Sequence, residues 1–303
     1  MVINSNHAFE KEKTLHVNEY RVEDIVKVYK SDLNIDVKFY FKDIDKVQLL
    51  ECVNTGYQFY VPNGIEGDST FYELLENFDW YYMPWKWEHE VVKSLLNKKD
   101  KILEVGSGGL GFIEKLNFEG FDITGLELNE KSVKKAKLKE LNVLSETIQS
   151  YSQNNLNSFD LICSFQVLEH ISDVQSFLQA QINSLVSGGR LVICVPNNDS
   201  FIKLSEGGIL NLPPHHMGRW NPKSLKNLEK VFDIKMIRLA FEPLQDYHKE
   251  WYVSSVHDFY FRRHKLIRGL NKIFSFRKLI RLYANLNSRR IKGHSIMVVY
   301  EKK

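Results

Sequence analysis

The pattern of apolar and polar residues becomes regular after residue 100. Short apolar runs, such as 101–105 and 159–165, alternate with longer amphipathic stretches, such as 109–120 and 130–141. Apolar runs of this length predict buried strands, and the stretches between them predict helices. The alternation predicts an α/β fold built on a Rossmann-like, doubly wound parallel sheet, in which ligands bind at the carboxyl ends of the strands.

The same pattern continues toward the C-terminus. Residues 173–186 are predicted to form a helix, and residues 188–196 to form a strand. Residues 233–242 and 293–303 also have the composition of strands, and we expect them to close one edge of the sheet.

The first hundred residues are patterned differently. Residues 35–41, 46–52 and 55–64 predict strands, whereas residues 71–98 form an aromatic-rich stretch that predicts helix. We therefore expect residues 1–70 to be a small β-rich accessory module that packs beside the functional site or mediates formation of a homodimer.

Composition narrows the class of protein. A hydrophobic content of 43% in 303 residues supports a packed core. The sequence has no apolar leader at its start and no run of about 18 apolar residues, so we expect a cytoplasmic protein. The cysteines Cys52, Cys163 and Cys194 fit no metal-ligand spacing, so we expect free thiols and no bound metal.

The positive charge is concentrated near the C-terminus. Residues 259–292 contain eleven Lys or Arg and no Asp or Glu, whereas the preceding residues are net acidic. We expect two short helices here, forming either a solvated edge or a contact with an anionic membrane surface at the inner face of the membrane. Nucleic acid is not expected, because no recognition motif accompanies the charge. The chain thus divides into residues 1–70, a core of 71–258, a basic helical insertion of 259–293 and a final core strand of 294–303.

A glycine-rich loop follows the first regular strand. Gly106, Gly108 and Gly111 match the spacing of a dinucleotide-binding loop, and Glu127 lies where an acidic residue holds a ribose. An NAD site is therefore one alternative. Glu104, two residues before the first glycine, would repel a pyrophosphate and attract a cation. A ligand that combines adenosine with positive charge suits Glu104 and Glu127 better.

Four segments in this order resemble the class I S-adenosylmethionine-dependent methyltransferases, in the branch that includes ubiquinone-biosynthesis and sugar O-methyltransferases. These segments are ILEVGSGGLGFIEKL, GFDITGLELNEKSVKKAK, FDLICSFQVLEHISDV and LVSGGRLVICVPNN, and the resemblance covers roughly residues 80–240 and the last strand. It implies the class I fold and S-adenosylmethionine as the cofactor. The chain departs from the family at Leu110, where a third glycine is usual.

The resemblance also implies roles for individual residues. The cofactor loop would be formed by Glu104, Gly106 and Gly108; the ribose would be held by Glu127, with Leu128 against the adenine; Phe165 and Gln166 would flank the methionine part. Tyr82 and Lys86, in the aromatic stretch before the first strand, are candidates for a lid over the cofactor, with Lys86 meeting the methionine carboxylate.

The acceptor side contains candidate bases. Methyl transfer to a hydroxyl requires removal of a proton, and histidine suits that task. The candidates are His215 and His216 in the segment PPHHMGRW, and His170 after the fourth strand of the core. Arg219 is a candidate for holding an anionic group of the acceptor, and Trp220 for stacking on a sugar or another flat face. Rigid-loop or packing roles for these residues are the alternative.

The expected function is S-adenosylmethionine-dependent O-methylation of a sugar, glycan or lipid-linked glycan in surface-polysaccharide biosynthesis, with a histidine as general base. That acceptor rests on family-level similarity. The alternatives are methylation of RNA or of a small aromatic metabolite, and a non-catalytic protein that binds the cofactor or a partner.

Overall fold

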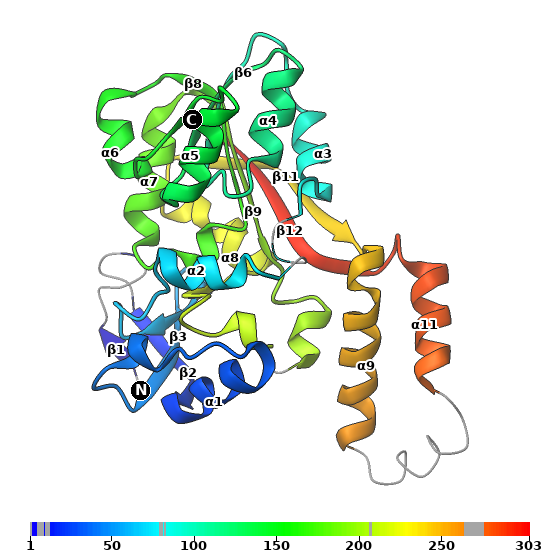
Figure 1. Cartoon of the computed structure of the whole chain (residues 1–303). Helices are drawn as coiled ribbons and strands as arrows, with labels where there is room; N and C mark the ends of the chain where they lie inside the picture. The colour runs from blue at the N-terminus through cyan, green and yellow to red at the C-terminus, as the bar shows by residue number, and fades with distance from the viewer. Residues whose placement is uncertain are drawn as a thin grey trace.

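The computed structural model describes residues 2–4, 9, 13–78, 81, 83–205, 208–263 and 276–303. Its strands form two sheets (Figure 1). The larger sheet has seven strands in the order β11-β12-β9-β8-β5-β6-β7. Their bounds are β5 Lys101–Val105, β6 Asp122–Leu126, β7 Val143–Leu144, β8 Phe159–Phe165, β9 Leu185–Pro196, β11 Ile234–Pro243 and β12 Lys292–Lys302.

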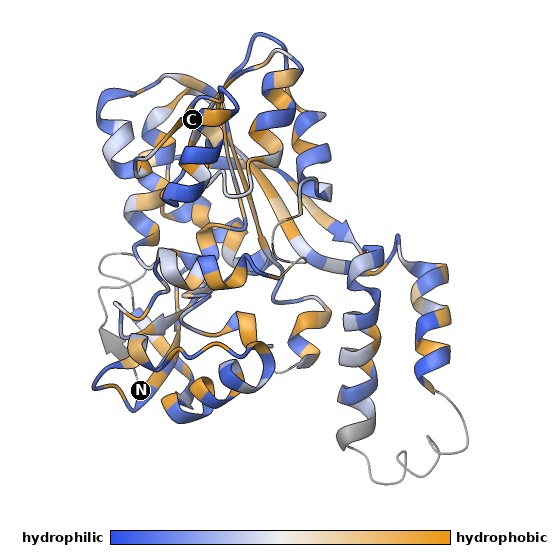
Figure 2. Ribbon diagram, in the orientation of Figure 1, coloured by the Kyte–Doolittle hydropathy of each residue, from blue (hydrophilic) through white to orange (hydrophobic). Residues whose placement is uncertain are grey.

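The larger sheet confirms the predicted fold class. Strands β5 to β9 pair in parallel, whereas β12 runs antiparallel to both β9 and β11. Its two faces contribute to separate apolar clusters, since Ile102 of β5 lies in one cluster and the next residue, Leu103, lies in the other. Figure 2 shows the apolar residues gathered along these central strands.

Helices cover both faces of the larger sheet (Figure 1). The α-helices here are α3 Trp87–Lys93, α4 Gly111–Phe118, α5 Glu130–Leu138, α6 Ile148–Tyr151, α7 Val174–Ser184 and α8 Pro222–Asn227. Short 3-10 turns η2 to η7 span Ser152–Asn154, Leu168–His170, Phe201–Ser205, Ile209–Asn211, Leu228–Lys230 and Asp246–His248. Strands and helices alternate as the sequence predicted, and the carboxyl ends of the parallel strands meet at one edge.

The smaller sheet joins the start of the chain to a distant segment. Its order is β1-β2-β3-β4-β10, with β1 Val2–Asn4, β2 Lys13–Arg21, β3 Lys46–Cys52, β4 Gln58–Val61 and β10 Gly218–Arg219. Helix α1, Val22–Leu33, packs against this sheet through Ile25 and Tyr29. Strand β10 therefore fixes the segment just before it against the N-terminal region. The division of the chain into four regions stays a prediction.

Two expectations of secondary structure were wrong. Residues 35–41 form no strand; the 3-10 helix η1 spans Lys38–Phe41, and the Asp36 carboxylate accepts a hydrogen bond from the Lys38 N–H at 2.9 Å. That local bond starts a turn and competes with strand pairing. The stretch 71–98 forms two short helices, α2 Ser69–Leu75 and α3, in place of one, and Pro84 in the segment between them cannot continue a helix.

Two helices project from the body of the molecule (Figure 1). They are α9, Lys249–Arg263, and α11, Phe276–Asn287, and the basic residues between them lie outside the described part of the chain. Among the described helices, none combines the length and the apolar character needed to cross a membrane.

Candidate functional site

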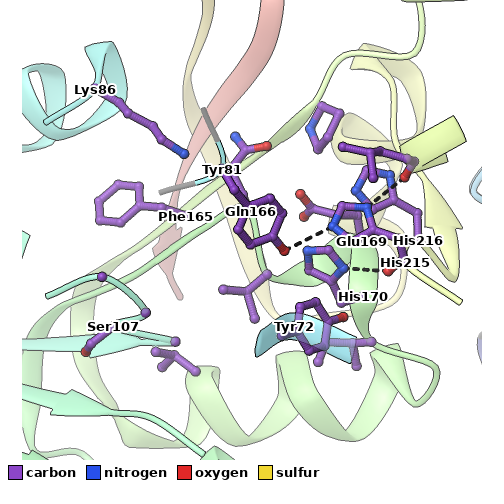
Figure 3. Close-up of a pocket in the computed structure, with 18 of the residues that line it drawn as sticks. Tyr72, Tyr81, Lys86, Ser107, Phe165, Gln166, Glu169, His170, His215 and His216 are labelled. Carbon is purple, nitrogen blue, oxygen red and sulfur yellow. Dashed lines mark hydrogen bonds between the residues drawn. The ribbon is translucent and has the colours of Figure 1, made fainter. Parts of the chain in front are cut away.

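A cavity of about 1290 Å³ opens at the carboxyl ends of the parallel strands. Its wall includes residues that follow β5, β6, β8 and β9, and also parts of the N-terminal region and of α9. Figure 3 shows side chains from several of these elements directed into it. The strand ends therefore bring together groups that lie far apart in the sequence.

The glycine loop after β5 turns sharply along one side of the cavity. Gly106 and Gly108 have positive φ values of 81° and 42°. A Cβ atom on Gly106 would lie 2.5 Å from Val167 Cγ2, so the backbone there approaches its neighbour too closely for any side chain. Leu110 has a φ of 68°, a left-handed conformation that glycine adopts more readily. The loop thus keeps its turn at Leu110, the position where the sequence departs from the family.

Glu104 lies at the floor of this loop with only 3% of its surface exposed. Its Oε2 atom is buried without a hydrogen-bond partner among the described residues. Burial raises the pKa of this carboxyl to about 8, and the nearby Glu127 adds to the increase. A positively charged ligand such as S-adenosylmethionine would favour loss of the proton and pair with the resulting carboxylate, whereas the negative charge of a pyrophosphate would disfavour it.

Glu127 stands at the end of β6. Its two carboxylate oxygens accept hydrogen bonds from the N–H groups of Gly108, at 2.6 Å, and Asn129, at 2.7 Å. These bonds orient the carboxylate and leave lone pairs for a ribose hydroxyl. Leu128 beside it is 59% exposed and lines the cavity. Both residues lie where the sequence places the adenosine part of the cofactor.

The remaining predicted cofactor residues follow β8 or precede α3. Phe165 and Gln166 line the cavity, and the Gln166 Nε2 donates to Ser295 Oγ at 3.3 Å. Lys86 also lines the cavity, and Figure 3 shows its side chain extending toward Gln166. Tyr82 lies outside the described residues. The residues that are described fit S-adenosylmethionine, with Lys86 available for its carboxylate.

The three candidate histidines meet on another wall of the cavity (Figure 3). His170, His215 and His216 each contribute one ring nitrogen to a group whose members lie within 4.8 Å of one another. The Nδ1 atom of each ring bonds to an oxygen: His170 to the His215 carbonyl at 2.6 Å, His215 to the Leu210 carbonyl at 2.9 Å, and His216 to Asn211 Oδ1 at 3.3 Å. Carbonyl and amide oxygens only accept hydrogen bonds, so Nδ1 carries the proton and Nε2 keeps its lone pair, which in His215 faces the Tyr81 hydroxyl at 3.1 Å.

Burial makes these histidines weak bases. It lowers the pKa of His170 to about 4, and it lowers the pKa values of His215 and His216 well below the usual 6.5. All three imidazoles are therefore neutral at pH 7. General bases work best with pKa values near the operating pH. These histidines are therefore poor bases for an ordinary hydroxyl and could deprotonate only an acceptor hydroxyl that has become acidic.

Arg219 and Trp220 are not among the residues that line the cavity. The Arg219 guanidinium bonds to the hydroxyls of Tyr20 and Tyr60 in the smaller sheet. Trp220 is fully buried and stacks on Tyr57 with ring centroids 4.0 Å apart. These positions do not support the expected contacts with an acceptor, because both side chains are engaged in packing the N-terminal region.

Sequence reasoning missed a polar wall on the side of α3, β11 and α9. Its members line the cavity and are Glu88, Glu242, His248, Trp251 and His294. Glu88 and Glu242 are each 1% exposed, so their burial is an unusual feature for a carboxyl group. The only local signal was the motif WEHE, which contains Glu88; the other residues lie on segments with no recognisable motif.

Comparisons with known proteins show the family of the chain. Residues 80–239 match the family model described as "Methyltransferase domain". The ubiquinone biosynthesis O-methyltransferase of Pectobacterium carotovorum subsp. carotovorum (strain PC1) is 30% identical over 106 residues, which make up 33% of this chain and 44% of that protein. Its counterpart in Escherichia coli O9:H4 (strain HS) is 26% identical over 165 residues, 52% of this chain and 65% of that protein. The chain thus matches less than two thirds of the length of these relatives.

Among solved structures, a SAM dependent methyltransferase from Archaeoglobus fulgidus has a TM-score of 0.47 and 19% sequence identity, and the match covers 71% of this chain and 94% of that chain. The family model by itself spans more than half of the present chain. The chain therefore belongs to the methyltransferase-domain family, within the class I S-adenosylmethionine-dependent methyltransferases that the sequence predicted.

Proposed function

We propose that this protein transfers the methyl group of S-adenosylmethionine to a hydroxyl oxygen of a sugar or glycan. The cofactor supplies a methyl group that its sulfonium already activates. Glu104, Glu127 and Lys86 hold the cofactor, and the rest of the cavity positions the acceptor and excludes water. The names of the matched relatives, which are O-methyltransferases, support oxygen as the methylated atom.

The polar wall is the observation that supports a sugar as the acceptor. Glu88 Oε1 and His248 Nδ1 are buried without hydrogen-bond partners among the described residues. Glu242 is partly satisfied, because its carboxylate accepts bonds from the Ser295 N–H at 2.9 Å and the Tyr247 hydroxyl at 3.2 Å. An apolar aromatic acceptor would leave the unpartnered atoms unsatisfied, which costs about 1–3 kcal/mol each. The hydroxyls of a sugar would satisfy them.

An aromatic ring completes this wall. Trp251 is 37% exposed and lines the cavity next to His294, with ring centroids 5.5 Å apart. An indole face suits the apolar face of a sugar ring, while buried carboxylates receive its hydroxyls. Buried polar groups combined with a partly exposed indole thus favour a polyhydroxylated acceptor over a flat apolar one.

His170, His215 and His216 form one wall of the cavity, called here the histidine wall. It is the proposed place where the acceptor oxygen loses its proton. As the new C–O bond forms, the oxygen gains positive charge and its proton becomes strongly acidic, so a weak base suffices. Three neutral imidazoles offer two routes: one Nε2 atom accepts the proton, as the sequence predicted, or the three together hold a metal ion that acidifies the hydroxyl.

A membrane contact is a further part of the proposal. Four exposed residues, Leu279, Leu282, Tyr283 and Leu286, are spaced to share one side of the projecting helix α11. Basic residues Arg277 and Arg281 bond to Glu250 of α9, which fixes the two helices together. An exposed apolar stripe on a basic helix suits an anionic lipid surface, where lipid-linked acceptors reside.

The acceptor is tested with labelled cofactor. The protein is incubated with labelled S-adenosylmethionine and separate pools of nucleotide sugars, glycans and phenolic metabolites, and the products are identified by mass spectrometry. We expect label in a sugar. Glu88→Gln and Glu242→Gln should raise KM for that sugar about tenfold or more, corresponding to a lost buried hydrogen bond, without changing the affinity for S-adenosylhomocysteine.

The surface variant His16→Gln serves as the control and should behave as the wild type. Label only in phenols would overturn the sugar assignment. Binding of S-adenosylhomocysteine without transfer to any pool would favour the non-catalytic alternative. Loss of turnover in His170→Ala, His215→Ala or His216→Ala would support the histidine wall, whereas unchanged turnover in all three would remove it from the mechanism.

A further inference from the structure

We propose that His170, His215 and His216 bind one divalent transition-metal ion of the Zn²⁺ type at the histidine wall of the cavity. This inference concerns the histidine wall of the proposed function. It differs from the expectation of no metal, which rested on the spacing of the cysteines. The three histidines come from two segments that are 45 residues apart and that only the fold brings together.

The orientation of the rings is the first argument. Each Nδ1–H is held by a carbonyl or amide oxygen, from His215, Leu210 or Asn211. Histidines that bind metals almost always donate their other ring N–H to such an oxygen, which fixes the tautomer and aims the free nitrogen. All three imidazoles have this arrangement, so Nε2 is the nitrogen with which each ring would bind an ion.

The distances are the second argument. One nitrogen from each ring lies within 4.8 Å of the others, and the rings of His215 and His216 are stacked with centroids 4.4 Å apart. Nitrogens bound to one tetrahedral Zn²⁺ at about 2.0–2.1 Å lie about 3.3 Å from one another. Side-chain rotations that move the nitrogens by about 1 Å would therefore close the site.

A buried carboxylate provides an independent argument. Glu169 precedes His170 in the sequence, is 1% exposed and lines the same cavity. Its Oε2 atom is buried without a hydrogen-bond partner among the described residues. An unpartnered carboxyl oxygen in a cavity wall is costly on its own, and a water molecule bound to the ion would give it a hydrogen-bond partner.

The ligand type selects the metal. Imidazole nitrogens suit Zn²⁺, Co²⁺, Ni²⁺ and Cu²⁺, whereas Mg²⁺ and Ca²⁺ prefer oxygen ligands. Three protein ligands leave one position of a tetrahedral ion open, which is typical of catalytic rather than structural zinc. The Tyr81 hydroxyl now lies 3.1 Å from His215 Nε2, and the ion would take its place at that nitrogen.

The ion would assist methyl transfer by binding the acceptor oxygen. That oxygen occupies the open position, and its O–H bond is weakened by the ion, so that the proton passes to water. The oxygen then forms the new bond to the methyl carbon while the carbon–sulfur bond breaks and its electron pair stays on sulfur. The imidazoles act as ligands in this route, so none of them needs to be a strong base.

Metal binding is tested without any acceptor. Tag-free, full-length protein is stripped with a chelator and titrated by calorimetry with Zn²⁺, Co²⁺ or Mg²⁺. We expect about one Zn²⁺ or Co²⁺ per chain, no binding of Mg²⁺, and a visible Co²⁺ absorption band typical of nitrogen ligands in a site of low coordination number.

Variants assign the ligands. His170→Gln, His215→Gln and His216→Gln should each weaken Zn²⁺ affinity by about 100-fold or more, and Asn211→Leu, which removes the oxygen that holds His216, by about 10-fold. His248→Gln is a matched control from the same cavity and should keep the affinity. Binding of S-adenosylhomocysteine shows that each variant is folded.

Two outcomes would overturn the inference: no Zn²⁺ or Co²⁺ binds, or binding persists unchanged in all three histidine variants. Because no acceptor is present, either result leaves the proposed methyl transfer untouched. Conversely, a histidine-dependent Zn²⁺ site in a protein that methylates no sugar would support the metal site and refute the acceptor assignment.

Discussion

At the scale of single residues, burial sets the chemistry of the cofactor side. Glu104 is a carboxyl group in an apolar strand end, and its pKa of about 8 means that it holds its proton at pH 7 in the ligand-free protein. A positively charged ligand favours the carboxylate. Binding of S-adenosylmethionine should therefore release a proton from this residue.

This linkage predicts a pH dependence of cofactor affinity. The pKa of Glu104 in the free protein lies above the usual 4.5, and the bound cation lowers it. The affinity for S-adenosylmethionine should then rise by up to about tenfold per pH unit toward pH 8 and level off above it. Calorimetry between pH 6 and pH 9 measures the trend. The Glu104→Gln variant should bind S-adenosylmethionine more weakly, and its affinity should depend much less on pH. An equal pH dependence in both proteins would contradict this assignment.

At the scale of elements, the N-terminal region positions the segment PPHHMG. Tyr29 of α1 and Tyr60 of β4 donate hydrogen bonds to the carbonyls of Leu212 and Asn211, each at 2.9 Å. The Gly67 N–H donates to the Pro214 carbonyl at 2.8 Å. These bonds, together with strand β10, hold the two histidines against His170. Hydrogen bonds therefore join the N-terminal region to the segment that contains His215 and His216.

Tyr29→Phe tests this connection. Loss of a fully buried hydrogen bond should lower the free energy of unfolding by about 1–2 kcal/mol and allow the histidine segment to shift. We expect reduced turnover and unchanged affinity for S-adenosylhomocysteine. Tyr300→Phe is the matched control, because it removes an equally buried bond, to the Leu225 carbonyl, away from the cavity. If both variants lost turnover equally, general destabilisation would explain the effect.

At the scale of the whole molecule, α9 and α11 extend away from the two sheets (Figure 1). The start of α9 adjoins the cavity, since Trp251 lines it, and the neighbouring α11 exposes its apolar stripe. A surface bound by α11 would thus lie near the acceptor wall. Binding of α11 to a membrane would thus bring the cavity close to the lipid surface, where a lipid-linked acceptor resides.

The contact predicts binding to anionic vesicles. Replacement of both Leu282 and Leu286 by serine should reduce co-sedimentation with anionic vesicles by about tenfold or more, because two exposed leucines no longer enter the lipid. Leu138→Ser, an exposed leucine on α5, should have no effect. Equal binding of all three proteins, or equal binding to neutral vesicles, would refute the membrane contact.

Much of the fold and of the cofactor side followed from the sequence. The alternation of strands and helices predicted the parallel sheet, and Glu104, Gly106 and Glu127, which the sequence singled out by their spacing, line one cavity in the structure. The stretch 71–98 was misjudged because its aromatic residues hid the break at Pro84. For Trp220 the sequence left acceptor binding and packing open, because the residue type is the same in both cases; in the structure its ring stacks on Tyr57.

The sequence by itself determined the elements whose signals are local: the apolar strands, the glycine turn and the acidic residues at fixed distances from it. Only the tertiary structure decided that His170 meets His215 and His216, and that Glu88 faces the same cavity as Glu242 and Trp251. Periodicity and short spacing are set by neighbouring residues, whereas these encounters depend on the path of the whole chain. The geometry of the acceptor wall therefore came from the fold, and the residue types alone did not contain it.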